Sequence, residues 1–178
     1  MKKVLLFGAF FALFGMSAYA QEEEAAEPVT DEELTQYATM EAMTLLYKDD
    51  KTEELRNMVL ENEVIDGGAR YNEIKAAWGD DAKMAEAEVT EEEKAAYQAI
   101  LDFQNSLQQS MVDYKTELIT ESDVISVPVY NKVLAATKED PALKEKLDSM
   151  ITEIKAEKDA ERAAEKEDGE AEAAEDGK

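Results

Sequence analysis

Residues 29–37 read VTDEELTQY, and residues 89–97 read VTEEEKAAY. A second pair of segments follows in the same order, because YNEIKAA at residues 71–77 returns as YNKVLAA at residues 130–136. The first pair is separated by 60 residues and the second by 59. Segments that recur in order at one spacing define the repeating unit of a fold. The sequence therefore predicts two similar halves, residues 29–88 and residues 89–154.

Each half begins with the signature of a helix N-terminus. In a capping box, a Thr side chain accepts a hydrogen bond from the amide three residues on, and a Glu there accepts one from the Thr amide. Thr30 with Glu33 and Thr90 with Glu93 match this pattern. Apolar residues then recur every three or four positions, most regularly at Ile100, Phe103, Leu107, Met111, Tyr114 and Leu118. This spacing indicates an amphipathic helix, so we expect a long helix at the start of each half.

Shorter elements are predicted between the long helices and after them. Residues 48–51, KDDK, interrupt the first apolar pattern, and either a helix break or an exposed turn fits them. Asp66-Gly67-Gly68 ends this segment, since paired glycines stop a helix and allow a reversal. A short helix is expected over residues 69–78. In the second half, Pro128 falls near the first turn of a short helix, where its missing amide costs nothing, and Asp140-Pro141 opens the last helix.

The two ends of the chain differ from the repeats. Residues 1–20 combine a basic start, an apolar run and an Ala-x-Ala ending, the pattern of a secretory signal peptide. We expect cleavage after Ala20 and a periplasmic or secreted mature chain without stable membrane insertion. Residues 21–28 form an acidic lead-in that we expect to be disordered. Residues 155–178 are rich in Ala, Glu and Lys, and we expect them to extend the last helix and to fray before Gly169.

The predicted fold is all-α. No segment has the alternating pattern of a half-buried strand, and the elements above assemble into one helical bundle over residues 29–154. In this bundle two long-helix/short-helix units, with coiled-coil-like spacing, end in an acidic disordered or frayed tail. We expect the short helices to share one core with the long helices. The predicted inner residues are Tyr71, Ile74, Trp78, Tyr130, Val133 and Thr137, against Leu55, Met58, Phe103, Leu107 and Tyr114.

Composition excludes several classes of function. The chain has 43 acidic and 19 basic residues and a formal net charge of −24, which repels nucleic acid and anionic lipid. It has no Cys and no His. Disulfides, thiol catalysis, Cys or His metal sites and Ser–His nucleophiles therefore cannot be built from these residues. Hydrolysis by paired carboxylates stays open.

The order of the motifs is similar to a known bacterial domain. Thr-Asp-Glu-Glu-Leu followed by Tyr, then Tyr-Asn-x-Ile/Val-x-Ala-Ala, then Asp-Pro-x-Leu resembles the bacterial domain of unknown function 4168 (DUF 4168). Residues 29–38 resemble its start and residues 130–147 its end, while residues 71–84 resemble a more degraded copy of the same end. The resemblance implies two degenerate copies of this domain and brings no catalytic residue with it.

Two sets of residues are candidates for a site. Asn62, Asp66 and Glu73 fall at positions 1, 5 and 12 of a twelve-residue calcium loop, but Val64 at position 3 has no side-chain ligand. We therefore favour a glycine turn there over a metal site. The second candidate is a polar pseudo-symmetric site made of Tyr71, Asn72, Tyr130 and Asn131. We favour the alternative in which each Tyr packs on its long helix, the one in its own half, and each Asn faces solvent.

Trp78 and the methionines each allow two interpretations. Trp78 stands at helical spacing from Tyr71 and Ile74, which favours a core position over stacking on a ligand. Flexible thioethers either fill gaps in a core, which we favour, or form an adaptable binding surface typical of a holdase. The methionines concerned are Met40, Met43, Met58, Met84, Met111 and Met150.

Together these observations favour an exported, non-enzymatic interaction protein of the bacterial envelope, with a protein partner and without a cofactor. The alternatives are a hydrolase that depends on carboxylates or divalent cations, and a calcium-binding protein. Three or more carboxylates converging in a concave pocket would favour these alternatives. Carboxylates scattered over outer faces would favour the binding protein.

Overall fold

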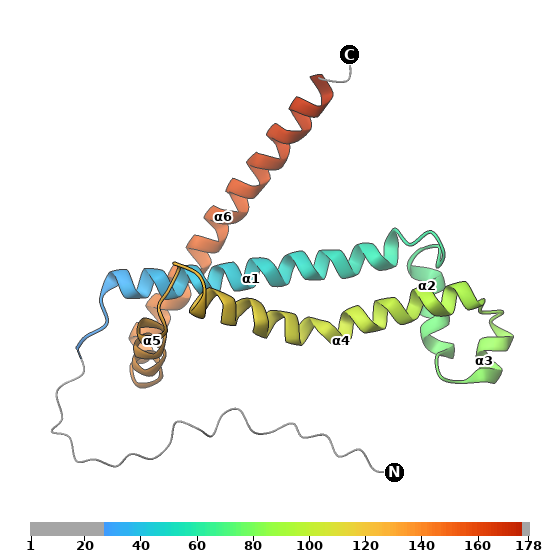
Figure 1. Cartoon of the computed structure of the whole chain (residues 1–178), viewed down its shortest axis with the longest axis horizontal. Helices are drawn as coiled ribbons and strands as arrows, with labels where there is room; N and C mark the ends of the chain where they lie inside the picture. Colours follow the sequence, from blue (N-terminus) through green and yellow to red (C-terminus); the bar gives the residue numbers. More distant parts are fainter. Residues whose placement is uncertain (1–26, 176–178) are drawn as a thin grey trace, which may run out of the picture.

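Two long helices, α1 (Asp31–Leu60) and α4 (Glu91–Thr120), lie side by side and run in opposite directions (Figure 1). The structure, a computed structural model, describes the backbone of residues 27–175 and the side chains of residues 27–165. The remaining helices are α2 (Gly67–Ala77), α3 (Asp81–Glu86), α5 (Val127–Glu139) and α6 (Pro141–Glu175). Over the described range the chain is helical and contains no strand, so the predicted all-α bundle is confirmed.

Both predicted capping boxes are present. The Thr30 hydroxyl accepts from the Glu33 amide at 3.2 Å, and the Glu33 carboxylate accepts from the Thr30 amide at 2.8 Å. Thr90 and Glu93 make the same two bonds at 3.1 and 2.8 Å. Helix α1 then continues without interruption through residues 48–51. KDDK is therefore an exposed helical turn and not a break.

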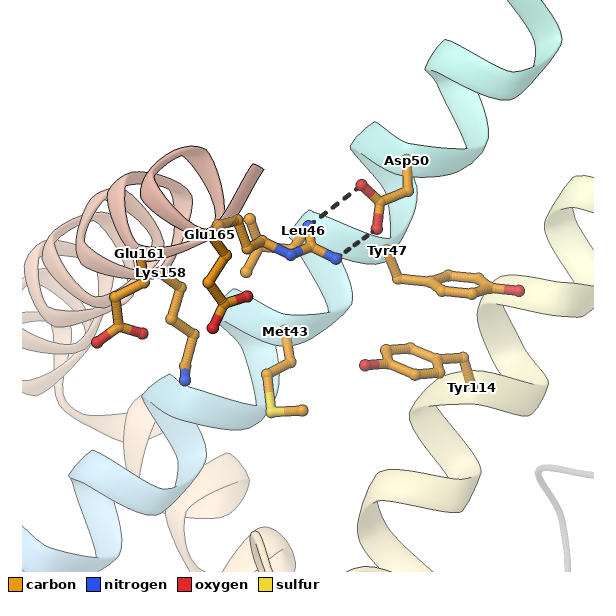
Figure 2. A pocket seen from close by; sticks show the side chains of 9 residues that line it. Met43, Leu46, Tyr47, Asp50, Tyr114, Lys158, Glu161 and Glu165 are labelled. Atoms are coloured by element: carbon orange, nitrogen blue, oxygen red, sulfur yellow. Dashed lines mark hydrogen bonds and ion pairs between the residues drawn. The ribbon is translucent and has the colours of Figure 1, made fainter. Parts of the chain in front are cut away.

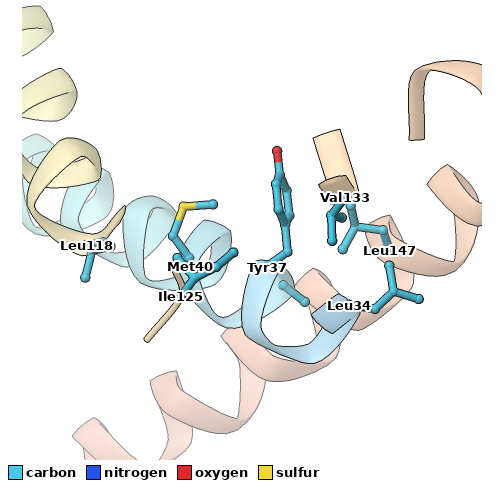
Figure 3. Close-up of a cluster of buried hydrophobic side chains, with 8 residues drawn as sticks. Leu34, Tyr37, Met40, Leu118, Ile125, Val133 and Leu147 are labelled. Atoms are coloured by element: carbon cyan, nitrogen blue, oxygen red, sulfur yellow. The ribbon is translucent and has the colours of Figure 1, made fainter. Parts of the chain in front are cut away.

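The apolar residues form two separate cores, one at each end of the α1/α4 pair. The first core combines α1, α5, α6 and the end of α4 (Figure 3); its buried members are Leu34, Tyr37, Ala38, Met40, Leu118, Ile125, Val133 and Leu147. The second core lies at the other end and contains Ile65, Tyr71, Ile74, Tyr97 and Ile100. The expectation of one shared core is therefore wrong: two helices of 30 residues are too long for both short helices to meet at one place.

Each core joins a long helix of one half to the short helix of the other half. Tyr37 of α1 stacks on Tyr130 of α5 with ring centroids 5.4 Å apart. Tyr97 of α4 packs on Tyr71 of α2 with centroids 5.3 Å apart. The repeats are thus exchanged, because the first turns of each long helix are covered by residues from the other copy.

The turn after each long helix also repeats at a spacing of 60 residues. Asn62 donates to the Met58 carbonyl and accepts from the Val64 amide. In the second half the Ser122 hydroxyl donates to the Leu118 carbonyl and accepts from the Val124 amide. Each turn is followed by a buried isoleucine, Ile65 or Ile125.

The last helix of each half begins in the same way and ends differently. Asp80 accepts from two amides at the start of α3, and Asp140 accepts from two amides at the start of α6. Helix α3 has 6 residues whereas α6 has 35. Helix α6 is therefore the extended counterpart of α3, and it packs along α1.

The tail predicted to extend the last helix does so, and α6 reaches Glu175. Two ion pairs link the first turns of this extension to α1. Lys155 lies 2.9 Å from a carboxylate oxygen of Asp49, and Arg162 donates to both carboxylate oxygens of Asp50 at 3.1 and 2.7 Å. The acidic pair within residues 48–51 therefore holds the first turns of the tail against α1.

Between residues 27 and 175, no helix combines the length and the apolar character needed to cross a membrane. The predicted signal peptide at residues 1–20 lies outside the described residues, as do most of the acidic lead-in and residues 176–178.

The two separate cores predict local effects of core truncation. Ile74 and Val133 are both fully buried, one in each core, so Ile74→Ala should cost about 2–4 kcal/mol and Val133→Ala about 1–3 kcal/mol. Hydrogen exchange should accelerate mainly in α2 for the first variant and mainly in α5 for the second. Asn72→Ala and Asn131→Ala, at exposed neighbouring positions, should cost under about 0.5 kcal/mol. Equal acceleration at both ends from either variant would contradict the division into two cores.

Candidate functional site

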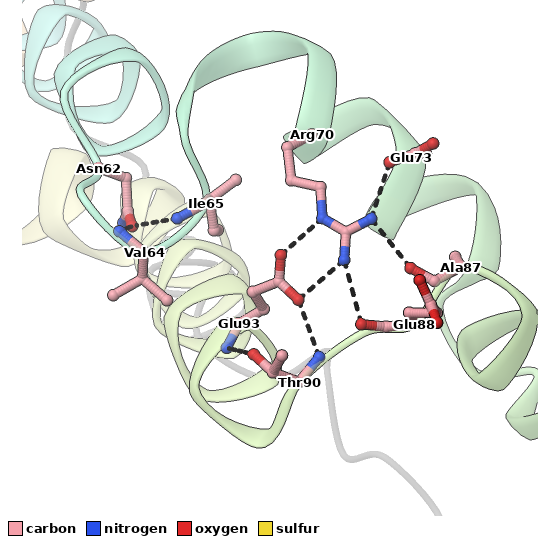
Figure 4. A network of polar contacts seen from close by, with 9 residues as sticks. All are labelled: Asn62, Val64, Ile65, Arg70, Glu73, Ala87, Glu88, Thr90 and Glu93. Atoms are coloured by element: carbon pink, nitrogen blue, oxygen red, sulfur yellow. Dashed lines mark hydrogen bonds and ion pairs between the residues drawn. The ribbon is translucent and has the colours of Figure 1, made fainter.

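Two of the proposed calcium ligands, Asn62 and Glu73, make other contacts, and the third, Asp66, is exposed. Oδ1 of Asn62 accepts from the amides of Val64 and Ile65, both at 3.0 Å (Figure 4). A carboxylate oxygen of Glu73 lies 2.7 Å from Arg70. Asp66 is exposed and has a left-handed backbone with φ of 51°. These residues build a turn, and no group of three carboxylates suited to a metal ion occurs within the part of the chain that the structure describes.

The Tyr-Asn pairs do not come together. Tyr71 belongs to the core around α2 and Tyr130 packs against the core around α5, at opposite ends of the α1/α4 pair. Both Asn72 and Asn131 are exposed. Each Asn is thus in solvent, as we favoured from the sequence, but each Tyr stacks on a tyrosine from the long helix of the other half and not of its own.

Arg70 is the centre of the polar network that fastens the second core (Figure 4). Its guanidinium donates to both carboxylate oxygens of Glu93, at 2.5 and 2.9 Å. It also donates to the carbonyls of Ala87 and Glu88, and Glu88 has a strained positive φ of 50°. Arg70 thus ties α2 to the α3–α4 connection and to the capping box of α4.

The first core has a weaker version of the same contact. Lys132 of α5 donates to both carboxylate oxygens of Glu33 at 2.8 Å, so each capping-box glutamate pairs with a cation from the other half. The Arg70 hydrogen bonds hold the pKa of Glu93 at about 2, against an ordinary 4.5. The Lys132 hydrogen bond also lowers the pKa of Glu33. Both contacts are structural.

Trp78 and most of the methionines serve packing. Trp78 is half-buried, and its ring centroid lies 4.5 Å from that of Tyr97. It packs against the second core, in line with the core position that the sequence favoured. Met40 is fully buried in the first core, while Met58 and Met150 pack against the edges of the two cores. Met43 is different, because it also lines a groove.

This groove lies between α1, α4 and the tail of α6, and we call it the tyrosine groove (Figure 2). Its volume is about 250 Å³. The apolar lining is Met43, Leu46, Tyr47 and Tyr114, and the polar lining is Asp50, Lys158, Glu161, Arg162 and Glu165. The rings of Tyr47 and Tyr114 stack with centroids 4.2 Å apart and planes 12° apart. Burial raises the pKa of Tyr114 above its ordinary value, so the Tyr114 ring is uncharged at neutral pH.

An acidic hollow of about 490 Å³ shares residues with the tyrosine groove. It is lined by Asp49, Asp50, Glu53, Asp159, Arg162, Ala163 and Glu165. Five carboxylates therefore converge in a concave place, the arrangement that we expected to favour a hydrolase or a calcium-binding protein. Three of them face cations, because Arg162 holds Asp50 and Lys155 lies against both Asp49 and Asp159. This pairing favours a role in charge recognition over metal binding.

The tyrosine groove was not predicted from the sequence. Neither Tyr47 nor the tail was a candidate for a site, and the ion pair between Arg162 and Asp50 joins positions 112 residues apart. One signal was present: Lys155, Lys158 and Arg162 recur at intervals of three and four residues, which places these cations on one face of a helix.

Comparisons with protein-family models, with curated proteins and with solved structures find no match for this chain.

The turn geometry predicts a weak and nonspecific response to calcium. Millimolar calcium should raise the melting temperature slightly by screening the acidic surface, and added salt should remove the effect. The variant Asn62→Ser, which copies Ser122 of the other half, should respond as the parent does. A saturable, salt-resistant stabilisation with a midpoint of about micromolar calcium, lost in this variant, would establish a metal site instead.

The pairing of Glu93 predicts a pH-dependent contribution to stability. Because the pKa of Glu93 is lower in the folded chain, the unfolded chain takes up the proton first as the pH falls. The stabilisation is thus complete above about pH 4.5 and is lost as the pH approaches 2. Glu93→Gln should cost about 2–3 kcal/mol at pH 7 and progressively less below pH 4.5, as measured by urea unfolding. Glu92→Gln, an exposed neighbour in the same turn, is the control. A loss that is constant across this pH range would show that Arg70 does not hold Glu93 as a charged group.

Proposed function

We propose that this chain is a non-enzymatic interaction protein that is exported to the bacterial envelope and binds a protein partner. The observation that carries the proposal is the tyrosine groove, which combines an apolar floor with charged walls. A binding surface typically has this composition, with aromatic residues at its centre and polar residues at its rim.

Three other features support the proposal. The pattern of residues 1–20 is typical of a signal peptide, which favours a periplasmic or secreted location. The other polar clusters, around Arg70 and around Lys132, are used for packing the two halves. The resemblance to the domain of unknown function 4168 is to a bacterial domain, which favours a bacterial protein, and it brings no catalytic residue with it.

Site-specific photo-crosslinking in the source cell tests this function. A crosslinking side chain is placed in turn at exposed positions over the surface, namely Leu45, Leu60, Val112, Val127 and Glu161. We expect a discrete protein adduct from at least one position, recovered from the periplasmic or secreted fraction and identified by mass spectrometry. Absence of a discrete adduct from every position would contradict the proposal, as would an adduct formed only in the cytoplasm.

A further inference from the structure

We propose that the tyrosine groove binds a basic amphipathic peptide segment of another protein. One apolar side chain of the segment lies on the Tyr47–Tyr114 pair, and its lysine or arginine side chains lie against the surrounding carboxylates. This inference rests on the proposed function as an interaction protein and specifies the chemistry of the partner.

The floor of the groove suits an apolar side chain as an anchor. Tyr47 and Tyr114 are both half-buried and stack on each other. Leu46, which also lines the groove, is 5% exposed and therefore fixed by packing. Large aromatic surfaces of this kind dominate the energetics of interfaces. The volume of about 250 Å³ is below the usual range of about 300–1,000 Å³ for small-molecule sites. The groove therefore suits one anchoring side chain better than a whole cofactor.

The walls of the groove favour positive charge in the occupant. Asp50, Glu161 and Glu165 border it, and the adjoining acidic hollow adds Asp49, Glu53 and Asp159, with Arg162 shared between the two. The local cations are largely compensated, because Arg162 is bound by Asp50 and Lys155 by both Asp49 and Asp159. Lys158 is the other cation in the lining.

The six carboxylates around this site therefore outnumber its three cations, Lys155, Lys158 and Arg162. The whole chain also has a net charge of −24. Such a field attracts a basic segment and repels an acidic one, and it also repels anionic lipid headgroups.

The shape of the site fits a helical segment. The tail of α6 crosses α1 and projects away from the α1/α4 pair (Figure 1), which leaves the groove at the junction of three helices. A helix laid into a groove between helices is a recurring mode of peptide recognition, in which apolar residues on one face act as anchors. A basic amphipathic helix carries the two properties that the floor and the walls select.

Fluorescence anisotropy with the full chain tests this inference. The probe is a labelled amphipathic peptide of leucine and lysine; one control peptide has serine for leucine, and another has glutamate for lysine. The test variant is Glu161→Lys with Glu165→Lys, both at exposed positions. The matched control is Glu63→Lys with Glu145→Lys, which makes the same change in net charge at exposed positions outside the groove lining. Circular dichroism verifies that both double variants keep their helices.

We expect the leucine–lysine peptide to bind, and the groove variant to weaken binding about ten-fold more than the control variant. The serine and glutamate peptides should bind at least about ten-fold more weakly to the parent chain. Equal weakening by the two double variants, or equal binding of the serine peptide, would overturn the inference and leave only attraction by net charge.

The two proposals fail in different ways. If the peptide does not bind while crosslinking from another surface position captures a discrete partner, the groove assignment is wrong and the interaction function stands. If crosslinking gives no adduct from any position, the interaction function itself is wrong.

Discussion

The antiparallel contact between α1 and α4 determines where every other element can pack. It brings the first turns of each long helix beside the turn and the short helix that belong to the other half. Each capping-box glutamate therefore has two tasks, closing its own helix N-terminus and accepting a cation from the other copy. For Glu93 the cation is Arg70 and for Glu33 it is Lys132. The capping box, which is a local feature of the sequence, is thus also part of the contact between the halves.

The halves differ chiefly in what covers their long helices. Helix α6 packs along α1, where Ala38 and Ala42 are fully buried. The positions 60 residues later in α4 are Gln98 and Asp102, which are exposed and hydrogen-bonded to each other at 2.7 Å. These polar residues are consistent with the short α3, because within the described residues no long helix covers that face of α4. The tyrosine groove lies beside α1 for the same reason, since four of its nine lining residues come from α6.

Local features of the fold could be predicted from the sequence, and long-range contacts could not. The capping boxes, the reversal at Gly67 and the all-α class follow from interactions within a few residues, which leave clear patterns. The exchange of Tyr37 and Tyr97 between the halves leaves none, because periodicity shows which face of a helix is apolar but not which helix covers it. The groove depends on such contacts throughout, so the sequence contained its residues without indicating that they meet.

The exchanged packing also governs the order in which the chain can fold. Leu34 and Tyr37 are synthesised early, yet the residues that bury them come from α5 and α6, and the Glu33–Lys132 pair joins positions 99 residues apart. Closing so long a loop costs entropy before any contact repays it, which slows folding. Until the second half is complete, the start of α1 presents bare apolar surface to other chains. The duplicated architecture thus gives the nascent protein a period of vulnerability to aggregation that two independently folding repeats would avoid.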